Sequence, residues 1–197
     1  MLKFEEAEVD RVSCGLDEVG RGPLAGPVVA SAVVLDSQKV IDGITDSKKL
    51  TPERRQVLAR EVKQHSTSWA IGLCEVEEID ELNILRASLL AMQRAFEQLK
   101  VEVDLALIDG IHSPMLNCET HTIIKGDSKV DSIGAASILA KVTRDEIMTR
   151  YHEEFPEYGF HRNFGYPTPD HLRVLRKIGP CVIHRKSFRP VANWTSL

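Results

Sequence analysis

Residues 12–35 decide the fold, and they read VSCGLDEVGRGPLAGPVVASAVVL. Both ends of this stretch, residues 12–16 and 28–35, are rich in apolar and β-branched side chains, which predicts two β-strands. The segment between them is rich in glycine and proline, which predicts a connecting loop. Two acids, Asp17 and Glu18, come directly after the first strand. Because reactive side chains collect at strand ends in α/β proteins, this junction is a candidate functional site.

Beyond this pair, predicted strands and helices alternate along the chain. Thr51-Pro52-Glu53 provides a cap and a proline at the first helical position, so a helix is expected to about Gln64. Apolar residues spaced by three and four from Ile79 to Leu99 predict one long amphipathic helix. Further strands are expected at residues 66–73, 103–108 and 121–124, and further helices from Asp127 or Ser128 through Ile147 and from Thr168 to Gly179.

This order of elements predicts an α/β fold with a mixed β-sheet flanked by helices and a small helical carboxy-terminal portion, at about residues 150–197. No repeat, low-complexity segment or Gly/Ser linker interrupts the chain. Residues 1–197 are therefore expected to form a single domain.

The charge of the chain is unevenly distributed. The net charge of −4 argues weakly against a polyanionic partner, but residues 1–124 carry 13 basic and 21 acidic residues, and residues 125–197 carry 12 and 8. From His161 onward, seven Arg or Lys face a single acid, Asp170. This distribution suits a protein that binds phosphates on one side, although a solvated helical surface would also produce it.

Other features of the composition exclude several classes of protein. No apolar run approaches the roughly 20 residues of a membrane-spanning helix, and the amino terminus lacks the apolar core of a signal peptide, so a cytoplasmic protein is expected. The cysteines are widely separated and form no CxxC pair, which excludes zinc-ribbon spacing. Reduced and mostly buried thiols are expected at all four positions, Cys14, Cys74, Cys118 and Cys181.

Four acids stand at the ends of predicted elements beside apolar runs: Asp17, Glu18, Asp109 and Asp127. Carboxylates gathered beside a core repel one another and resist desolvation unless cations neutralise them. Mg²⁺ prefers oxygen ligands, and two such ions can activate water and stabilise the leaving oxygen of a phosphodiester. A turn at Asp109-Gly110 and a helix cap at Asp127 would explain two of these acids without a metal.

Several other residues are candidates for binding phosphate or sugar. Gly20 and Gly22 allow backbone amides to approach an anion, and Arg21 between them can form bidentate hydrogen bonds to a phosphate. Ser47 and Lys48 lie just before a predicted helix start, which favours anions, although a solvated turn is an alternative. In the basic carboxy-terminal stretch, Tyr166 can stack on a sugar or base, or can simply pack, and Arg185 adds phosphate-binding charge.

These residues fall into ordered motifs that strongly resemble those of bacterial ribonuclease HII. The resemblance begins with Gly15-Leu16-Asp17-Glu18-Val19-Gly20-Arg21-Gly22-Pro23-Leu24-Ala25-Gly26-Pro27-Val28 and extends to about Phe188. The intervening motifs are Asp46-Ser47-Lys48-Lys49-Leu50, Asp80-Glu81-Leu82-Asn83-Ile84, Ile108-Asp109-Gly110, the run from Lys125-Gly126-Asp127-Ser128 to Asp145, Gly165-Tyr166-Pro167-Thr168, and His184-Arg185-Lys186-Ser187-Phe188.

The resemblance implies a ribonuclease H-like fold, a four-acid site at Asp17, Glu18, Asp109 and Asp127, and Mg²⁺ or Mn²⁺ as cofactor. It implies substrates that are RNA–DNA hybrids and duplex DNA containing ribonucleotides, cut on the 5′ side of the ribonucleotide to leave 3′-hydroxyl and 5′-phosphate ends. In the family, the segment matching Gly20, Arg21 and Gly22 senses the 2′-hydroxyl, and the tyrosine matching Tyr166 stacks on the following deoxyribose. We also expect a monomer, no membrane association, and a role in removing ribonucleotides from DNA during repair and replication.

Two departures from the family pattern stand out. Asn163-Phe164 replaces a common basic residue before Gly165, which puts one phosphate contact in doubt, and Gly134 stands where Ser or Ala is usual. The related ribonuclease HIII carries an extra amino-terminal domain, for which no room is expected before Val12. Two alternative functions stay open: a ribonuclease H-like nuclease acting on DNA alone, such as a junction resolvase, and a non-catalytic nucleic-acid-binding module.

Overall fold

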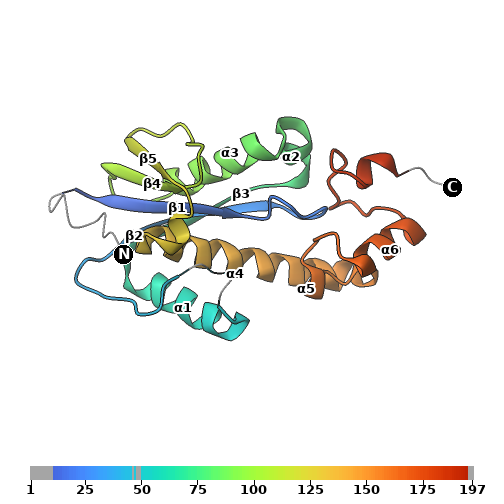
Figure 1. Ribbon diagram of the computed structural model, residues 1–197, viewed down its shortest axis with the longest axis horizontal. Helices are drawn as coiled ribbons and strands as arrows, with labels where there is room; N and C mark the ends of the chain where they lie inside the picture. The colour runs from blue at the N-terminus through green and yellow to red at the C-terminus, as the bar shows by residue number, and fades with distance from the viewer. Residues whose placement is uncertain (1–10, 46, 48–49, 195–197) are drawn as a thin grey trace.

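The computed structural model describes residues 11–45, 47 and 50–194. Within them, five strands form one mixed sheet in the order β3-β2-β1-β4-β5 (Figure 1). The β3–β2 and β2–β1 pairs are antiparallel, whereas β1–β4 and β4–β5 are parallel. The central strand β1 therefore has one antiparallel and one parallel neighbour. The strands are β1 Ser13–Val19, β2 Val28–Leu35, β3 Ser66–Cys74, β4 Leu105–Asp109 and β5 Glu119–Ile123.

Helices cover both faces of this sheet (Figure 1). On one face, Leu16 and Ala30 of the sheet pack with Ala91 of α3 in one apolar cluster. On the other face, Val33 packs with Leu58 of α1 and Leu139 of α4. The helices are α1 Pro52–His65, α2 Val76–Leu82, α3 Ile84–Glu97, α4 Asp131–Glu154, α5 Phe160–Asn163 and α6 Pro169–Ile178, with 3₁₀ turns at Gly126–Ser128, Pro156–Tyr158 and Val191–Asn193.

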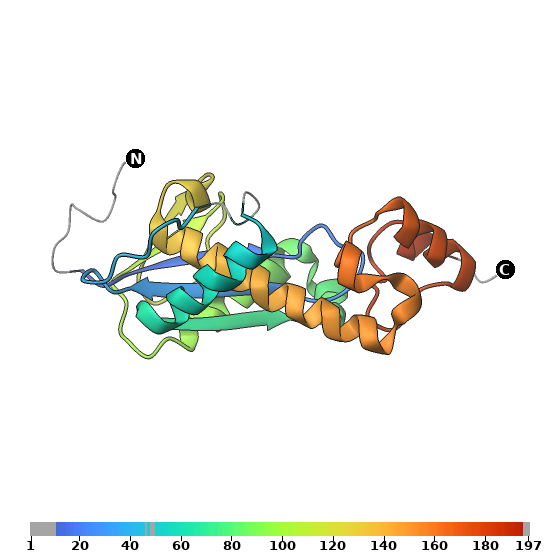
Figure 2. The ribbon, with the colours of Figure 1, turned by 90° about the horizontal axis from the view of Figure 1, so that it is seen from below.

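The carboxy-terminal portion folds around the far end of α4, beyond the sheet (Figure 2). Met148 of α4 packs there with Tyr158, Phe160 and Ile183. Ala25, from the loop between β1 and β2, belongs to the same buried cluster. The β1–β2 loop is therefore held between the sheet and the carboxy-terminal portion.

The predicted α/β architecture is confirmed, and two helix starts follow the expected capping pattern. The Thr51 hydroxyl accepts the Arg54 backbone N–H, and the Thr168 hydroxyl accepts the N–H of His171. In each case proline occupies the first helical turn, where its missing N–H would have no helical partner. Strand β1 extends further than predicted, so Asp17 and Glu18 lie within it.

The prediction of one long helix from Ile79 to Leu99 is wrong, because the chain breaks at Asn83. This residue adopts a positive φ of 69°, which asparagine tolerates better than most residues. Its side-chain oxygen accepts the N–H groups of Leu85 and Arg86 at 3.0 and 3.2 Å and so caps α3. The apolar spacing continues through the break because α2 and α3 both pack on the sheet.

The prediction that Asp127 or Ser128 caps the next helix is also wrong. Both residues lie in the separate 3₁₀ turn Gly126–Ser128, and α4 begins at Asp131 with Val130 in the cap position. The turn joins α4 through the Val130 N–H, which donates to the Gly126 carbonyl at 2.8 Å. Asp127 is therefore placed by the turn.

The predicted state of the cysteines is partly confirmed, since all four are free but only Cys14 and Cys74 are buried. Cys118 and Cys181 are intermediate in exposure. No helix in the described part of the chain is both long and apolar enough to span a membrane.

Candidate active site

Two neighbouring strands bring three of the predicted acids to one region of the sheet. Asp17 and Glu18 lie in β1, and Asp109 is the last residue of β4. Because Leu16 is level with Ile108 in this parallel pair, Asp17 and Asp109 follow at the same end of adjacent strands. Residues more than 90 positions apart in the sequence therefore meet at the centre of the sheet.

The charges of these carboxyl groups influence one another, and burial adds to the effect. The pKa of Asp17 is raised well above its ordinary value, first by burial and then by the charges of Glu18 and Asp109. Burial also raises the pKa of Glu18, opposed by Arg21 and reinforced by Asp109. Arg21 Nη1 lies 3.1 Å from Glu18 Oε1. The region concentrates negative charge that this partly exposed arginine counters only in part.

Backbone N–H groups hold two of the carboxylates in place. Asp17 Oδ1 accepts the N–H of Glu18 at 2.7 Å, and Ser137 of α4 also hydrogen-bonds to Asp17. Asp109 Oδ1 accepts the N–H of Gly126 at 2.6 Å. This bond fastens the 3₁₀ turn that carries Asp127 to the end of β4.

Asp127 is half-buried and follows the residue that is bonded to Asp109. Its carbonyl oxygen would lie 3.0 Å from a Cβ atom at Gly134, so the turn also presses against α4. Among the residues that the structure describes, no three His, Cys, Asp or Glu side chains form a group arranged to hold a metal ion. The four-acid metal site therefore stays a prediction.

The chemistry of the donors fits a hard divalent cation better than any softer metal. Asp17, Glu18 and Asp109 offer only carboxylate oxygens, the ligands that Mg²⁺ and Mn²⁺ prefer. Burial makes the charge of Asp17 unfavourable unless a cation offsets it. The residues present are thus consistent with the predicted cofactor class.

A cavity of about 230 Å³ opens beside Glu18, Arg21 and Asp109. Its other walls are residues of α3 and of the segment after β4, namely Leu85, Ser88, Leu89, Met92, Gly110, Ile111 and His112. His112, which lines this cavity, and Ser137, which bonds to Asp17, were not among the predicted site residues. A polar residue at a buried helix position was the available indication for Ser137, but nothing in the sequence distinguished His112.

The loop of residues 20–27, here called the glycine loop, meets Tyr166 at the surface. A Cβ atom at Gly22 would lie 3.6 Å from Tyr166 Cε1. The Leu24 N–H donates to the carbonyl of Gly165 at 2.8 Å and ties the two segments together. Gly20 has a φ of +95°, a conformation that side chains disfavour. The structure therefore brings Gly20, Arg21, Gly22 and Tyr166 together, with Arg21 reaching back to Glu18.

Two further predicted substrate-binding residues are placed differently from expectation, and a third lies outside the described residues. Ser47 is buried, and its hydroxyl lies 2.9 Å from the Ser137 hydroxyl, behind Asp17. Arg185 is fully buried, and its hydrogen bonds to the described residues go to backbone carbonyls. A direct contact of Arg185 with phosphate stays a prediction, which this buried placement does not support. Lys48 is not among the residues that the structure describes.

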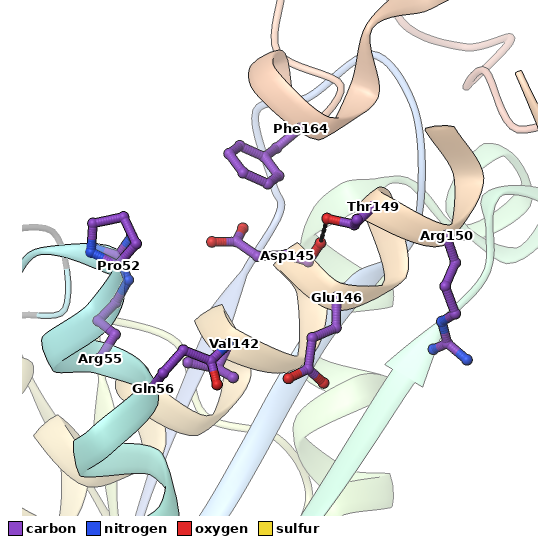
Figure 3. A pocket seen from close by; sticks show the side chains of 9 residues that line it. All are labelled: Pro52, Arg55, Gln56, Val142, Asp145, Glu146, Thr149, Arg150 and Phe164. Atoms are coloured by element: carbon purple, nitrogen blue, oxygen red, sulfur yellow. Dashed lines mark hydrogen bonds between the residues drawn. The ribbon is translucent and has the colours of Figure 1, made fainter. Parts of the chain in front are cut away.

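A larger cavity, of about 580 Å³, lies between α1 and α4 under the ring of Phe164 (Figure 3). Asp17, Glu18 and Asp109 do not line it. Lys141 Nζ lies 4.7 Å from the centre of the Phe164 ring and 2.6 Å from Asp145 Oδ1. A cation from α4 therefore stands close to the position where the family pattern places a basic residue.

Fold and site together define a ribonuclease H-like nuclease, with a mixed sheet covered by helices and acids at the ends of neighbouring central strands. The chain belongs to the ribonuclease HII family, whose model, described as Ribonuclease HII, matches residues 14–191. A ribonuclease HII of Nitrosomonas europaea is 55% identical over 190 residues, which cover 96% of this chain and 88% of that protein. One of Nitrosococcus oceani is 54% identical over 177 residues, which cover 90% and 88%.

Solved structures agree with this assignment. The ribonuclease H2 of Pyrococcus horikoshii matches with a TM-score of 0.77 and 26% identity, over 92% of this chain and 95% of that chain. A Bst-RNase HIII structure in complex with Mn²⁺ has a TM-score of 0.76 over 92% of this chain and 68% of that chain, and at 19% identity it supports the fold alone. The chain is a metal-dependent endonuclease of the hydrolase class, and ribonuclease H activity on RNA–DNA hybrids is expected of it.

Proposed function

We propose that this protein hydrolyses the RNA strand of RNA–DNA hybrids and cuts duplex DNA on the 5′ side of single embedded ribonucleotides, leaving 3′-hydroxyl and 5′-phosphate ends. One juxtaposition carries the proposal. Gly22 faces the ring of Tyr166, while the adjacent Arg21 is bonded to Glu18. The groups suited to sugar recognition, the glycine loop and Tyr166, therefore lie next to the acidic residues, with the Arg21–Glu18 ion pair between them.

The acids Asp17, Glu18, Asp109 and Asp127 would hold Mg²⁺ or Mn²⁺, two ions per site. Such ions, when bound, supply activation of water and stabilisation of the leaving oxygen of a phosphodiester. The chain orients the acids beforehand. The Glu18 N–H and Ser137 fix Asp17, and the Gly126 N–H fixes Asp109. Pre-set ligands reduce the reorganisation that binding would otherwise require.

Recognition of the cut site must contact the 2′-hydroxyl, because this group alone distinguishes ribose from deoxyribose. The glycine loop is suited to this task, since Arg21 and Gly22 are exposed and Gly22 leaves space beside Tyr166. The partly exposed ring of Tyr166 would stack on the deoxyribose that follows. A ribonucleotide followed by a deoxyribonucleotide would thus contact the glycine loop and the ring of Tyr166 at the same time.

Two residues have accessory roles in this proposal. Ser47 acts through Ser137, whose hydroxyl it meets at 2.9 Å, and so helps to orient Asp17. Lys48, which lies outside the described residues, would supply a phosphate contact. We further propose that the protein acts as a monomer in the cytoplasm and removes misplaced ribonucleotides from DNA during repair and replication.

The deciding experiment uses three end-labelled duplexes: an RNA–DNA hybrid, DNA with one ribonucleotide, and DNA alone. With Mg²⁺ or Mn²⁺, we expect cutting of the first two and a single cut 5′ of the embedded ribonucleotide. Cutting of the all-DNA duplex at equal rate would favour a DNA nuclease instead. If no metal-dependent cutting occurred that a chelator could stop, a binding module would be favoured.

The matched variant is Asp109→Asn, which retains an oxygen that can accept the Gly126 N–H. Hydrolysis should be abolished because the neutral amide removes one of the carboxylate charges that would hold the cations, whereas duplex binding and the melting temperature should change little. Full activity of D109N would remove Asp109 from the site.

A further inference from the structure

Two arginines lie buried behind the glycine loop, one on α4 and one after α6. Arg144 and Arg185 are both 0% exposed and are the largest fully buried side chains among the described residues. Burial lowers the pKa of Arg144 to about 10 and that of Arg185 to about 9, where repulsion by Arg144 also contributes. Both therefore stay charged at neutral pH. In the described part of the chain, neither forms an ion pair with a carboxylate.

The hydrogen bonds of Arg185 converge on the glycine loop. Its Nη2 donates to the carbonyls of Gly20 at 2.6 Å and Gly26 at 2.8 Å, and Nε donates to Gly26 at 3.0 Å. Its Nη1 donates to the carbonyls of Arg21 at 3.1 Å and Pro23 at 2.9 Å. The Arg185 backbone N–H donates to the Leu24 carbonyl at 2.8 Å. One residue thus holds five carbonyls of a single loop.

Arg144 holds the rest of the loop and connects it to the segment before Tyr166. Its Nε donates to the Pro27 carbonyl at 2.9 Å and its Nη2 to the Ala25 carbonyl at 3.0 Å. Its Nη1 donates to the carbonyl of Phe164, two residues before Tyr166, at 3.0 Å. Together, the two arginines bind every carbonyl of residues 20–27 except that of Gly22.

This pattern fixes the direction in which the loop amides point. A trans peptide directs its N–H opposite to its carbonyl, so the Arg21 and Gly22 amides point away from Arg185. Hydrogen bonding of a carbonyl to a cation polarises its peptide and strengthens the N–H as a donor. Both residues are exposed, on the side where Tyr166 lies beside Gly22. The buried charge therefore acts outward through the peptide units.

We propose that Arg144 and Arg185 are positioning residues that set the glycine loop for recognition of ribose. They turn the amides of Arg21 and Gly22 toward the substrate and hold them at a fixed place relative to Tyr166. This inference rests on the proposed function, because it assigns the buried arginines to selection of a ribonucleotide.

Lysine is the informative replacement at these positions because it retains a positive charge but not the fork. A guanidinium offers five donors in a rigid plane, whereas an ammonium is a compact point charge with three. Arg185→Lys can therefore reach only some of the carbonyls at Gly20, Arg21, Pro23 and Gly26. The loop keeps a nearby cation but loses its defined shape.

The experiment compares wild type, Arg185→Lys and Arg144→Lys on duplexes with and without one ribonucleotide. The matched control is Arg60→Lys, an exposed arginine of α1. We expect kcat/KM on the ribonucleotide duplex to fall by about 10–100-fold in R185K, as for other small displacements of positioned groups. Without divalent metal, R185K should bind the two duplexes with nearly equal affinity, whereas wild type and R60K should prefer the ribonucleotide. Binding to all-DNA duplex, and its salt dependence, should not change because the charge is kept.

Circular dichroism and thermal melting separate misplacement from unfolding. If R185K does not fold, R144K, which removes fewer hydrogen bonds, provides the same comparison. Unfolding of both variants would assign the arginines to stability alone and overturn the proposal. Wild-type discrimination in folded R185K and R144K would also overturn it while leaving the proposed function intact. If wild type itself shows no preference for the ribonucleotide, the proposed function and this inference both fail.

Discussion

At the scale of single residues, the contact between Tyr166 and Gly22 links sugar recognition to the rest of the site. The tyrosine is 40% exposed, and a Cβ at Gly22 would lie 3.6 Å from its ring. Such a side chain contributes little to the core, so its removal separates substrate recognition from folding.

Replacing Tyr166 with Ala should lower the rate of cleavage at a single ribonucleotide by about 10–100-fold, because a stacking interaction is worth about 1–3 kcal/mol. The melting temperature should stay near that of wild type. Tyr166→Phe, which keeps the ring, serves as the control and should retain most activity. Cleavage and melting would be measured on the same preparations, and wild-type turnover by Y166A would refute a role for the ring.

A second feature at this scale is the buried pair His171 and His184, whose Nε2 atoms lie 3.0 Å apart. The Cys181 N–H donates to His184 Nδ1, so a neutral His184 carries its proton on Nε2 and donates to His171. His171 Nδ1 then donates to the carbonyl of Tyr166 at 2.8 Å. This chain of bonds requires both rings to be neutral, and it ends at the residue that faces the glycine loop.

The pair predicts a loss of stability in acid. Burial, followed by repulsion from His171, lowers the pKa of His184 from 6.5 to about 4. Stability from the neutral ring is therefore complete above pH ~6.5 and is lost as the pH falls toward ~4, by on the order of 2–3 kcal/mol. Urea unfolding at several pH values would measure this.

The control for this prediction compares two single variants. His184→Gln should flatten the acid-dependent loss, whereas His65→Gln, at an exposed position on α1, should leave it unchanged. Carboxylates with raised pKa values contribute equally to both variants, so their difference isolates His184. Parallel pH profiles for H184Q and H65Q would contradict the assignment.

At the scale of elements, helix α2 places Asp80 against the segment that carries Arg185. Asp80 Oδ2 accepts the Lys186 N–H at 2.8 Å, and Oδ1 accepts the N–H and hydroxyl of Ser187 at 2.9 and 2.5 Å. Arg185 Cζ also lies 5.0 Å from the ring of Phe188. Helix α2 therefore anchors the residue that holds the glycine loop.

Replacing Asp80 with Ala should lower the free energy of unfolding by about 1–3 kcal/mol, toward the lower end because the site is partly exposed. It should also reduce ribonucleotide cleavage through Arg185. Asp80→Asn keeps one acceptor and should fall between D80A and wild type, while Glu81→Ala, an exposed neighbour, should match wild type. Chemical denaturation and cleavage assays test this, and equal stability of D80A and E81A would contradict it.

The elements also show what the sequence could and could not predict. Strands, capped helix starts and the α/β class followed from local patterns, because alternation and capping depend on nearby residues. The break at Asn83 was missed because the apolar spacing continues across it. The roles of Ser47 and Arg185 were missed for a different reason: a polar residue in a motif does not reveal whether its partners are substrate atoms or distant backbone carbonyls.

At the scale of the whole molecule, charge is segregated along the longest axis. The basic residues from Arg162 to Arg189 belong to the portion beyond the sheet, at the far end of α4 (Figures 1 and 2). Although the whole chain has a net charge of −4, its carboxy-terminal portion is positively charged, which suits binding to a nucleic-acid backbone.

Reversing two charges on α6, with Arg176→Glu and Lys177→Glu, should weaken binding to all duplexes without changing the preference for a ribonucleotide. The slope of log affinity against log salt should fall by about 2, because each lost phosphate contact removes roughly one unit. Fluorescence anisotropy across a salt series measures both quantities. Arg60→Glu with Lys63→Glu on α1 is the control, and an equal effect of the two pairs would contradict a polarised binding surface.

Helix α4 has one more consequence, which follows from its length. Its 24 residues extend about 36 Å at ~1.5 Å per residue. Gly134 and Ser137 adjoin Asp127 and Asp17 near its start, and Arg144 supports the glycine loop further along. This one helix therefore fixes the distance between the acidic site and the glycine loop. It also fixes how the two are rotated relative to each other about the helix axis. One residue inserted between Ser137 and Arg144 would rotate the glycine loop by about 100° relative to the acidic site, even if every side chain were retained.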